Sequence, residues 1–270
     1  MECWDESTEL GPPGIDLTRP SAARVYDYYL GGSHNFSVDR RMAEEAIRMW
    51  PELPSMMQAN RAFLRRAVGY VANQGVDQFV DIGSGIPTAG NVHEVVQPGR
   101  PTARVVYVDN DPVAVAHSRA ILADTALTAV VEADLRDAPS LFDSPALRGL
   151  VDLERPVALL LVAVLHFVAE PDDPYAAVHR CLDQLSPGSY LVLSHASADG
   201  QPVLAESHQK LYERTPTPMT MRTEAQISDF FAGLTMVEPG LVPIPRWRPE
   251  NDDDPETQRM VGYAGVGRKM

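Results

Sequence analysis

Apolar and polar positions divide the chain into two parts with different periodicities. After residue 75, short apolar runs alternate with segments in which apolar residues recur at helical spacing. The apolar runs are DQFVDIG (77–83), ARVVYVD (103–109), ALTAVVEAD (126–134), VALLLVAVLHFV (157–168) and GSYLVLSHAS (188–197). Continuous apolar strands separated by helices indicate a parallel sheet that is covered on both faces. We therefore predict an α/β fold with a Rossmann-like, doubly wound sheet.

The longest apolar run, 157–168, is too short to cross a bilayer and is expected to be one buried strand. Near the end of the chain, EAQISDFFAGL (224–234) predicts a helix. TMVEPGLVPI (235–244) and RMVGYAGVGRK (259–269) predict two strands on either side of an acidic loop, PENDDDPE (249–256). We expect these two strands to form a terminal hairpin added to the parallel sheet.

The first quarter of the chain predicts helices instead of strands. Apolar residues at helical spacing indicate helices at about 21–30, 38–50 and 55–73. Residues 1–20 contain prolines and glycines and predict a loose arm. The predicted organisation is therefore an N-terminal arm (1–20), a helical cap or lid (21–75) and a ligand-binding sheet domain (76–270).

Composition narrows the classes of function. With 270 residues, 44% of them hydrophobic, the chain can bury a sizeable core. Its net charge of −14 argues against a broad nucleic-acid surface, because phosphate binding needs a basic face. Two cysteines, Cys3 and Cys181, give neither a disulfide framework nor a metal-ligand spacing. With no apolar stretch at the amino terminus, these features predict a cytoplasmic protein without metal or membrane partners.

The strongest chemical motif is FVDIGSGIPTAGN (79–91), in which a predicted strand runs into Gly83-Ser84-Gly85 and a helix is expected near Thr88. Glycines let the backbone turn tightly and approach a ligand closely, although a plain strand-to-helix turn needs them too. Pro87 and Thr88 occupy the region where a dinucleotide fingerprint has its third glycine. This absence disfavours a nicotinamide-dependent oxidoreductase. Asp81, just before the loop, suits a cationic ligand better than a pyrophosphate.

Two further carboxylates follow the next two predicted strands. Asp109 lies at the spacing of the acid that accepts hydrogen bonds from both ribose hydroxyls in nucleotide-binding sheets. An ordinary helix cap is the alternative for Asp109, but Asp111, directly before Pro112, fits that role better. Asp134 follows the third strand, where it could accept from an adenine amino group, or it could be a plain surface acid.

Three motifs, VDIGSG (80–85), VDND (108–111) and EADLRD (132–137), resemble those of class I S-adenosylmethionine-dependent methyltransferases. Longer runs are similar to an actinobacterial S-adenosyl methyltransferase subfamily first catalogued as a domain of unknown function. These runs are PSAARVYDYYLGGSHNFSVDR (20–40), ANRAFLRRAV (59–68), DIGSGIPTAGNVHEV (81–95) and YVDNDPVAVAHSRAIL (107–122). The resemblance covers almost the whole chain from about residue 15. It implies a seven-stranded sheet with an antiparallel last strand and S-adenosylmethionine as cofactor.

The resemblance also implies roles for individual residues. Residues around the methionine part of the cofactor would be Asp81, Gly83, Ser84 and Gly85. Residues at the ribose and adenine would be Asp109, Asn110, Asp134 and Leu135. Pro87 departs from the general pattern, since many members have a third glycine there. The methyl acceptor does not follow from the resemblance, and we expect a small molecule.

Histidines and one arginine are candidates for the remaining chemistry. Methyl transfer requires the two reactants to be aligned and, for a weak nucleophile, a proton to be removed. His166, expected at the end of the fourth strand, is a candidate general base, with a packed histidine as the equal alternative. For His195, after the fifth strand, packing is favoured. Arg61, on the helix before the first strand, is suited to clamp a carboxylate.

The run ARVYDYYLGGSHNFSVDR (23–40) has two interpretations. It predicts a helix that ends at Gly31-Gly32 through a left-handed cap, followed by a second helix from about Ser37. As a plain helical hairpin it would have no function of its own. As a lid it would close over the cofactor, with Tyr28, Gly32 and Asn35 at the ligand. The leading hypothesis is methyl transfer to a small molecule, and the alternative is a catalytically silent cofactor-binding or regulatory protein.

Overall fold

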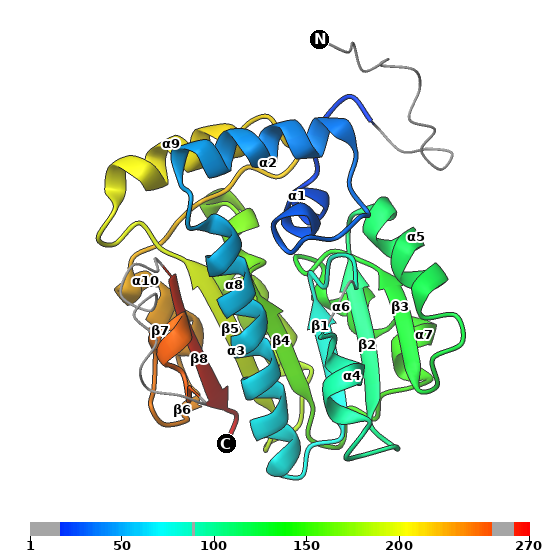
Figure 1. Ribbon diagram of the computed structural model, residues 1–270. Coiled ribbons are helices and arrows are strands. Elements are labelled where there is room, and N and C mark those ends of the chain that lie inside the picture. The colour runs from blue at the N-terminus through cyan, green and yellow to red at the C-terminus, as the bar shows by residue number, and fades with distance from the viewer. Residues whose placement is uncertain (1–16, 88–89, 250–261) are drawn as a thin grey trace.

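The computed structural model describes residues 17–87, 90–249 and 262–270. Its centre is one mixed sheet with strand order β3-β2-β1-β4-β5-β8-β6, in which β7 also pairs with β8 (Figure 1). The strands are β1 (Gln78–Ile82), β2 (Arg104–Asp109), β3 (Thr128–Glu132), β4 (Ala158–Val162), β5 (Tyr190–Ala196), β6 (Thr235–Met236), β7 (Val242–Pro243) and β8 (Gly262–Arg268). Strands β1 to β5 pair in parallel, and β8 is antiparallel to its neighbours. The prediction of a doubly wound sheet with an antiparallel last strand is confirmed.

Within the described residues the sheet has eight strands instead of the expected seven, because the predicted strand 235–244 is interrupted. Pro239 has no backbone N–H to give to a sheet ladder, and Gly240 has a φ of 88°. The chain therefore turns between β6 and β7. Both two-residue strands pair with β8, so the expected hairpin is present in a divided form.

Helices cover both faces of the sheet. They are α1 (Ala22–Tyr29), α2 (Ser37–Met49), α3 (Leu53–Asn73), α4 (Val92–Val96), α5 (Pro112–Ile121), α6 (Ala138–Phe142), α7 (Pro145–Arg148), α8 (Pro174–Asp183), α9 (Pro202–Tyr212) and α10 (Glu224–Ser228). Alternate residues of each strand enter different cores: Val80 and Ile82 face α6 and α8, whereas Phe79 faces α3 and α4. By this alternation the side chains of Asp81 and Asp109 are placed on the α3 side of the sheet.

The predicted cap is formed by α1, α2 and the first turns of α3, which lie over the carboxyl ends of the parallel strands (Figure 1). Leu53 and Met56 of α3 join this cap, while Phe63 and Val68 further along the helix pack on the sheet. Thus α3 belongs both to the cap and to the helix layer that covers the sheet. The predicted boundary at residue 75 falls after this helix, which connects the cap to the sheet. Residues 1–16 of the predicted arm and 250–256 of the acidic loop lie outside the described residues.

The cap contains one helix that the sequence pattern did not predict. Helix α9 lies beside α2 at the top of the molecule (Figure 1), and Leu211 and Tyr212 at its end belong to the same hydrophobic cluster as Val25 of α1 and Met42 of α2. An exposed ion pair between Arg214 and Glu45 joins the same two segments at 2.6 Å. The cap is therefore assembled from both halves of the chain.

The apolar run 157–168 is not one strand, which corrects the expectation from sequence. β4 ends at Val162, Ala163 has a φ of 58°, and residues Leu165–Phe167 form a 3₁₀ turn, η1. The amide of Ala163 donates to the backbone oxygen of Ser194 (3.1 Å) and to its Oγ (3.1 Å), which holds the chain in this bend. His166 consequently lies in a turn above the sheet and not at the end of the strand.

A buried ion pair organises the cap. Arg24 on α1 and Asp39 on α2 are 3% and 0% exposed, and Nε of Arg24 donates to Asp39 at 2.7 Å. The Asp39 carboxylate also accepts from the amides of Ser21 and Phe36, both at 2.9 Å. Every one of these donors belongs to the cap, so one carboxylate fixes the positions of both helix starts.

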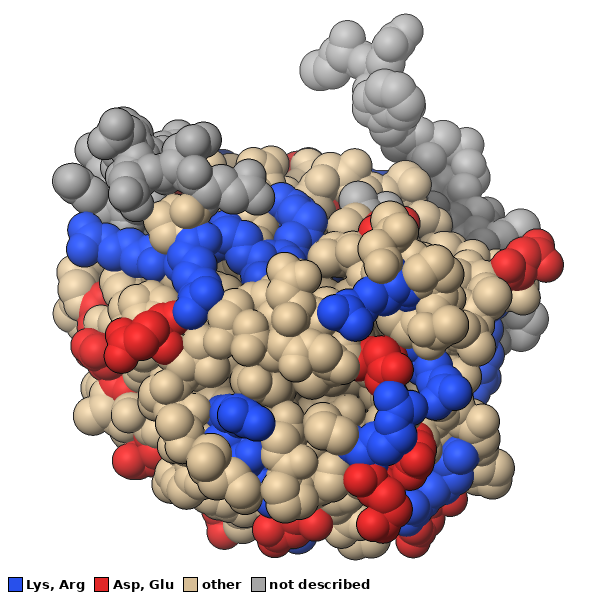
Figure 2. Space-filling view, turned by 90° about the horizontal axis from the view of Figure 1, so that it is seen from below, with Lys and Arg blue, Asp and Glu red and all other residues tan. Residues whose placement is uncertain are grey.

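The opposite end of the molecule carries charges of both signs. Figure 2 shows this face, at the amino ends of the parallel strands, with basic and acidic side chains close together. One such pair joins Arg155, before β4, to Asp77, before β1, at 2.8 Å. None of the helices in the described ranges has the length and apolar composition that a membrane span requires. Nor do the described side chains of His, Cys, Asp and Glu form a group of three or more suited to a metal ion.

We predict that Asp39→Asn strongly destabilises the protein, because it leaves the Arg24 guanidinium buried without its anionic partner. Removing one partner of a buried ion pair typically costs about 3–5 kcal/mol. Urea unfolding should show a loss of this size. The matched control is Asp143→Asn, which breaks an exposed pair with Arg148 and should cost under ~1 kcal/mol. Equal effects of the two substitutions would contradict the proposed role of Asp39.

Candidate active site

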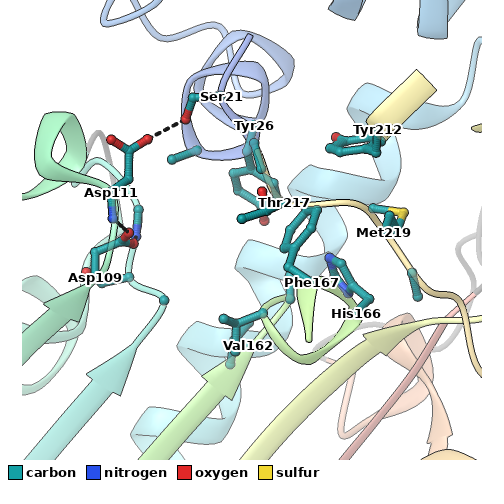
Figure 3. A pocket seen from close by; sticks show the side chains of 18 of the residues that line it. Ser21, Tyr26, Asp109, Asp111, Val162, His166, Phe167, Tyr212, Thr217 and Met219 are labelled. Carbon is teal, nitrogen blue, oxygen red and sulfur yellow. Dashed lines mark hydrogen bonds between the residues drawn. The ribbon is translucent and has the colours of Figure 1, made fainter. Parts of the chain in front are cut away.

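A cavity of about 760 Å³ lies between the cap and the carboxyl ends of β1, β2, β4 and β5. Figure 3 shows that Asp109 and Asp111 lie on one side of it, whereas His166, Phe167, Met219 and Tyr212 lie on the other. The predicted residues that line this cavity are Arg61, Asp81, Gly83, Ser84, Gly85, Asp109, Asn110, Asp134, Leu135 and His166. The fold thus brings most of the predicted site residues to one place.

The loop after β1 requires glycine at position 83. Gly83 has a φ of 70°, and a Cβ there would lie 2.3 Å from Cγ2 of Val164, in the bend after β4. Its amide donates to the Val108 carbonyl at 2.8 Å, which turns the chain toward β2. The loops that follow β1 and β4 can therefore touch only because residue 83 has no side chain. The predicted helix start near Thr88 is wrong: α4 begins at Val92 after Asn91, and residues 88–89 lie outside the described residues.

Asp109, the last residue of β2, holds this loop in place. Its carboxylate accepts from the amide of Gly85 at 2.8 Å and from the amide of Asp111 at 2.9 Å. Burial raises its pKa to about 6, although these two hydrogen bonds favour the ionised form. Asp111 caps α5 as predicted, by accepting from the Val113 amide at 2.8 Å. Its other oxygen accepts from the Ser21 hydroxyl, which ties the cap to the sheet (Figure 3).

Asp81 and Arg61 lie on the same wall of the cavity. Burial raises the pKa of Asp81 to about 7, and nearby Asp109 raises it further, whereas Arg61 opposes the shift. The Arg61 guanidinium donates to the backbone oxygen of Gly90 (3.3 Å) and to Oδ1 of Asn91 (3.2 Å). A buried carboxyl with so high a pKa is ready to ionise when a cationic ligand arrives.

Asp134, after β3, is part of a more exposed polar group. Arg136 donates to both of its oxygens, and Asn110 donates to it at 3.2 Å. The hydrogen bond from Arg136 is the main reason why the pKa of Asp134 falls to about 2. The carboxylate therefore stays ionised and keeps a fixed orientation next to the buried side chain of Leu135.

Three of the predicted cap residues do not line the cavity. Tyr28 points to α2, where its hydroxyl donates to Glu44 at 3.3 Å. Tyr26 lines the cavity instead, as Figure 3 shows, because residues two apart lie on opposite sides of a helix. The Tyr26 hydroxyl accepts from Nδ2 of Asn60 at 2.9 Å, and Oδ1 of Asn60 accepts from the Ser194 hydroxyl at 2.6 Å.

Gly32 and Asn35 serve the cap in another way. A Cβ at Gly32 would lie 2.1 Å from Oδ1 of Asp27, and Nδ2 of Asn35 donates to Oδ2 of the same carboxylate at 2.8 Å. Both residues therefore position the buried Asp27, which itself lines the cavity. As predicted, α1 ends with a left-handed glycine, Gly31, whose φ is 76°.

The two histidines of interest have different surroundings. His195 is fully buried, and Nη1 of Arg222 donates to its Nε2 at 2.9 Å, so its Nδ1–H donates to the Ala196 carbonyl at 2.6 Å. Arg222 also donates to the carbonyls of Leu165 and Val168, at 2.9 and 2.8 Å, and so fixes η1 from behind. His195 also lines the cavity, but both of its ring nitrogens have partners in the protein, which agrees with the packing interpretation. His166, on η1, lines the cavity, and its Nδ1 has no hydrogen-bond partner among the described residues.

Several lining residues escaped the sequence analysis, among them Tyr26, Asn60, Ser194, His208, Tyr212 and Met219. A signal existed for α9, since Leu204, Leu211 and Tyr212 follow helical spacing in PVLAESHQKLY (202–212). The segment around Met219 shows no periodicity. Its position depends on contacts with the rest of the cap.

Strand order, the glycine turn after β1 and the carboxylate at the end of β2 together define a class I methyltransferase fold. The chain belongs to the S-adenosyl methyltransferase family, whose model matches residues 8–270. It is therefore an S-adenosylmethionine-dependent methyltransferase, as the resemblance implied.

Solved structures agree with this membership. A DUF574 family protein from Streptomyces avermitilis is 41% identical, with a TM-score of 0.88 over 93% of this chain and 98% of its own. A protein from Thermobifida fusca, described as a candidate methyltransferase, is 40% identical, with a TM-score of 0.89 over 97% of this chain and 99% of its own. The N-methyltransferase NodS from Bradyrhizobium japonicum, solved with S-adenosyl-L-homocysteine, has 13% identity and a TM-score of 0.50 over 91% and 98%, and shares the fold. A comparison with curated protein sequences gives no match.

We predict that Gly83→Ala weakens cofactor binding by about tenfold or more, because the new Cβ forces the loops after β1 and β4 apart. Gly75→Ala is the matched control: residue 75 also has a positive φ, 95°, but no atom lies within 4 Å of the added Cβ. Both variants should lose stability from backbone strain. Calorimetric titration with S-adenosylmethionine should separate them, and equal affinities would contradict the role given to the contact with Val164.

The pKa values of Asp81 and Asp109 predict that the ligand-free protein becomes less stable as the pH rises. Both values, about 7 and about 6, exceed the ordinary 3.8, so the folded chain binds more protons than the unfolded chain at intermediate pH. This contribution is complete below about pH 4 and is lost as the pH rises through about 6 to 7. Asp81→Asn should therefore unfold less readily than the wild type at about pH 8 and show a weaker pH dependence in urea. If the free energy of unfolding of Asp81→Asn changes with pH as much as that of the wild type, the raised pKa of Asp81 is contradicted.

Proposed function

We infer that the protein transfers the methyl group of S-adenosylmethionine to a small-molecule acceptor inside the cavity under the cap. One observation carries this proposal: a single cavity has ionisable carboxyls on one side and uncharged aromatic and methionine side chains on the other. The first side suits a polar cofactor with a positive charge, and the second suits an organic acceptor. The volume of about 760 Å³ leaves room for both molecules.

The residues at the carboxyl ends of the strands fit S-adenosylmethionine. Asp109 would hold the ribose hydroxyls, and Asp134 with the Leu135 amide would bind the adenine beside Asn110. Asp81, Arg61 and the loop 83–85 would surround the methionine part. The absent Cβ of Gly83 keeps this loop close to the strands, and the pKa of Asp81 allows it to ionise beside a cation. When bound, the cofactor supplies a methyl group on a positively charged sulfur atom.

The chain's own residues would then orient the acceptor and receive its proton. Burial keeps the pKa of His166 well below its usual value, so the imidazole is neutral and can accept a proton. Arg222 fixes the turn that carries it. The cap lies over the cavity, and the water that the two bound reactants displace would strengthen the electrostatic interactions inside. Tyr26, held by Asn60, lies between the two sides (Figure 3).

We predict that Asp109→Asn and His166→Ala impair different steps, the first cofactor binding and the second methyl transfer. Loss of a charge-assisted hydrogen bond at the ribose should weaken S-adenosylmethionine binding about 10- to 100-fold in Asp109→Asn. His166→Ala should bind the cofactor within about twofold of the wild type but lose methyl transfer by about 100-fold or more. Calorimetry and release of S-adenosylhomocysteine measure the two effects. Asp143→Asn, an exposed substitution outside the cavity lining, should change neither.

The class of acceptor is tested with S-adenosylmethionine that carries a labelled methyl group. Wild-type protein is incubated with an actinobacterial cell extract, and small molecules are then separated from macromolecules by ultrafiltration. Label in the small-molecule fraction, dependent on His166, is the expected result. Label in protein or nucleic acid would contradict the proposed acceptor. Cofactor binding with no transfer to either fraction would favour a silent cofactor-binding protein.

A further inference from the structure

In the part of the cavity remote from Asp109, four segments contribute uncharged side chains to the lining, and we call this part the acceptor side. The segments are the chain from Trp50 into the start of α3, the η1 turn, α9 and the loop that follows α9. The side chains that matter are Trp50, Met56, Phe167, Tyr212, Met219 and Met221. Flat aromatic rings and flexible thioethers are suited to pack on the faces and edges of a planar apolar molecule.

Two histidines interrupt this apolar lining. His166 on η1 and His208 on α9 are 5% and 4% exposed, and both line the cavity. Burial lowers the pKa of His208 to about 4 and that of His166 well below its usual value, and His195, the Arg222 guanidinium and His208 nearby lower the pKa of His166 further. Both imidazoles are therefore neutral near pH 7.

The Nδ1 atoms of both histidines lack hydrogen-bond partners in the described part of the chain. Aromatic contacts hold the His208 ring, since its centroid is 6.0 Å from that of Trp50 and 5.1 Å from that of Tyr212. A buried polar atom without a partner costs free energy, because it has given up its hydrogen bonds to water. A ligand with a hydroxyl group would satisfy such an atom, whereas a purely apolar ligand would leave it unpaired.

We propose that the acceptor side binds an uncharged aromatic alcohol, a phenol or a related hydroxylated ring, and that its hydroxyl oxygen is the atom methylated. This inference rests on the proposed function of the cavity. The four segments contribute no charged side chain to the described lining, and the guanidinium of Arg19, which also lines the cavity, already donates to the carbonyls of Arg214 (3.4 Å) and Thr215 (3.0 Å). A carboxylate, phosphate or ammonium group would have to leave water for this largely uncharged surface, which is costly. A planar neutral molecule meets no such cost, and its hydroxyl finds a neutral imidazole to accept the proton.

The transfer balances in charge and atoms. The acceptor oxygen forms a bond to the methyl carbon while the sulfur–carbon bond breaks, and that electron pair stays on sulfur. The hydroxyl proton moves to His166 and then to solvent. The products are a methyl ether, S-adenosylhomocysteine and one proton. Positive charge thus moves from sulfur to the imidazole, so the buried site does not have to create a new charge.

The first test measures binding and does not depend on turnover. Full-length protein is saturated with S-adenosylhomocysteine and titrated calorimetrically with 2-naphthol, naphthalene, 2-naphthoate and 2-naphthylmethylamine. We expect 2-naphthol to bind about tenfold tighter than the other three ligands, because only it matches both the uncharged lining and the histidines. Tighter or equal binding of the carboxylate or the amine would overturn the proposal. So would the absence of 2-naphthol binding to a protein that holds S-adenosylhomocysteine.

The second test assigns the selectivity to the histidines. His208→Phe should bring the affinities for 2-naphthol and naphthalene within about twofold of each other. If His208 had a merely structural role, the substitution would weaken the binding of both ligands equally. His208→Gln, which keeps a hydrogen-bonding group, should retain part of the preference and serves if His208→Phe does not fold. The matched control, His179→Phe on α8, lies outside the cavity lining and should keep the wild-type ratio. An unchanged ratio in both His208 variants would overturn the role of His208.

Failure of this inference is distinguishable from failure of the proposed function. If the protein does not bind S-adenosylmethionine or S-adenosylhomocysteine, the proposed function fails. If it binds the cofactor and transfers labelled methyl groups to small molecules that are charged or lack a hydroxyl, only the acceptor class is wrong. Recovery of the label as a methyl ether of an aromatic alcohol is the expected outcome.

Discussion

The arrangement of the cavity depends on the hydrogen bonds of two carboxylates at the end of β2. Asp109 accepts from the amide of Gly85 and therefore fixes the loop after β1, and it also accepts from the amide of Asp111. Asp111 caps α5 and accepts from Ser21 at the start of the cap. One short segment, 109–111, thus connects the sheet, the glycine loop and the cap. This segment therefore helps to fix both the floor and the cover of the cavity.

The two sides of the cavity differ in how they deal with charge. Around Asp81 and Asp109, burial raises the pKa values of carboxyls that have few compensating cations nearby. Around His166 and His208, burial has the opposite consequence and keeps the imidazoles neutral. The same physical cause, desolvation, therefore prepares one side to receive a cation and the other to receive a neutral molecule. The proposed methyl transfer from a sulfonium to a neutral acceptor would use both properties.

The sequence alone predicted the parallel strands and the glycine loop, because continuous apolar runs and the Gly-Ser-Gly turn are local signals. It also placed Asp109, Asp134 and Arg61 at the cavity, since parallel strands end at the same edge.

The predictions from sequence were wrong where contacts between distant segments determine the structure. The run 157–168 bends at Ala163, whose amide is held by Ser194, and no local pattern shows this contact. The sequence predicted Tyr28 at the cavity instead of Tyr26. Which tyrosine faces the cavity depends on how α1 is rotated about its axis, and the spacing of tyrosines along one helix does not determine that rotation. Gly32 and Asn35 were predicted to lie at the cofactor, whereas both contact Asp27 and neither lines the cavity.

The central claim is that the carboxylate side of the cavity holds the cofactor and directs its sulfur toward the histidines. A crystal structure of the protein with S-adenosylhomocysteine tests it most directly. The account predicts that the Asp109 carboxylate accepts hydrogen bonds from both ribose hydroxyls, that the adenine lies beside Asp134, and that the sulfur faces His166. A ligand bound outside this cavity, or one whose sulfur faces away from His166 and His208, would contradict it.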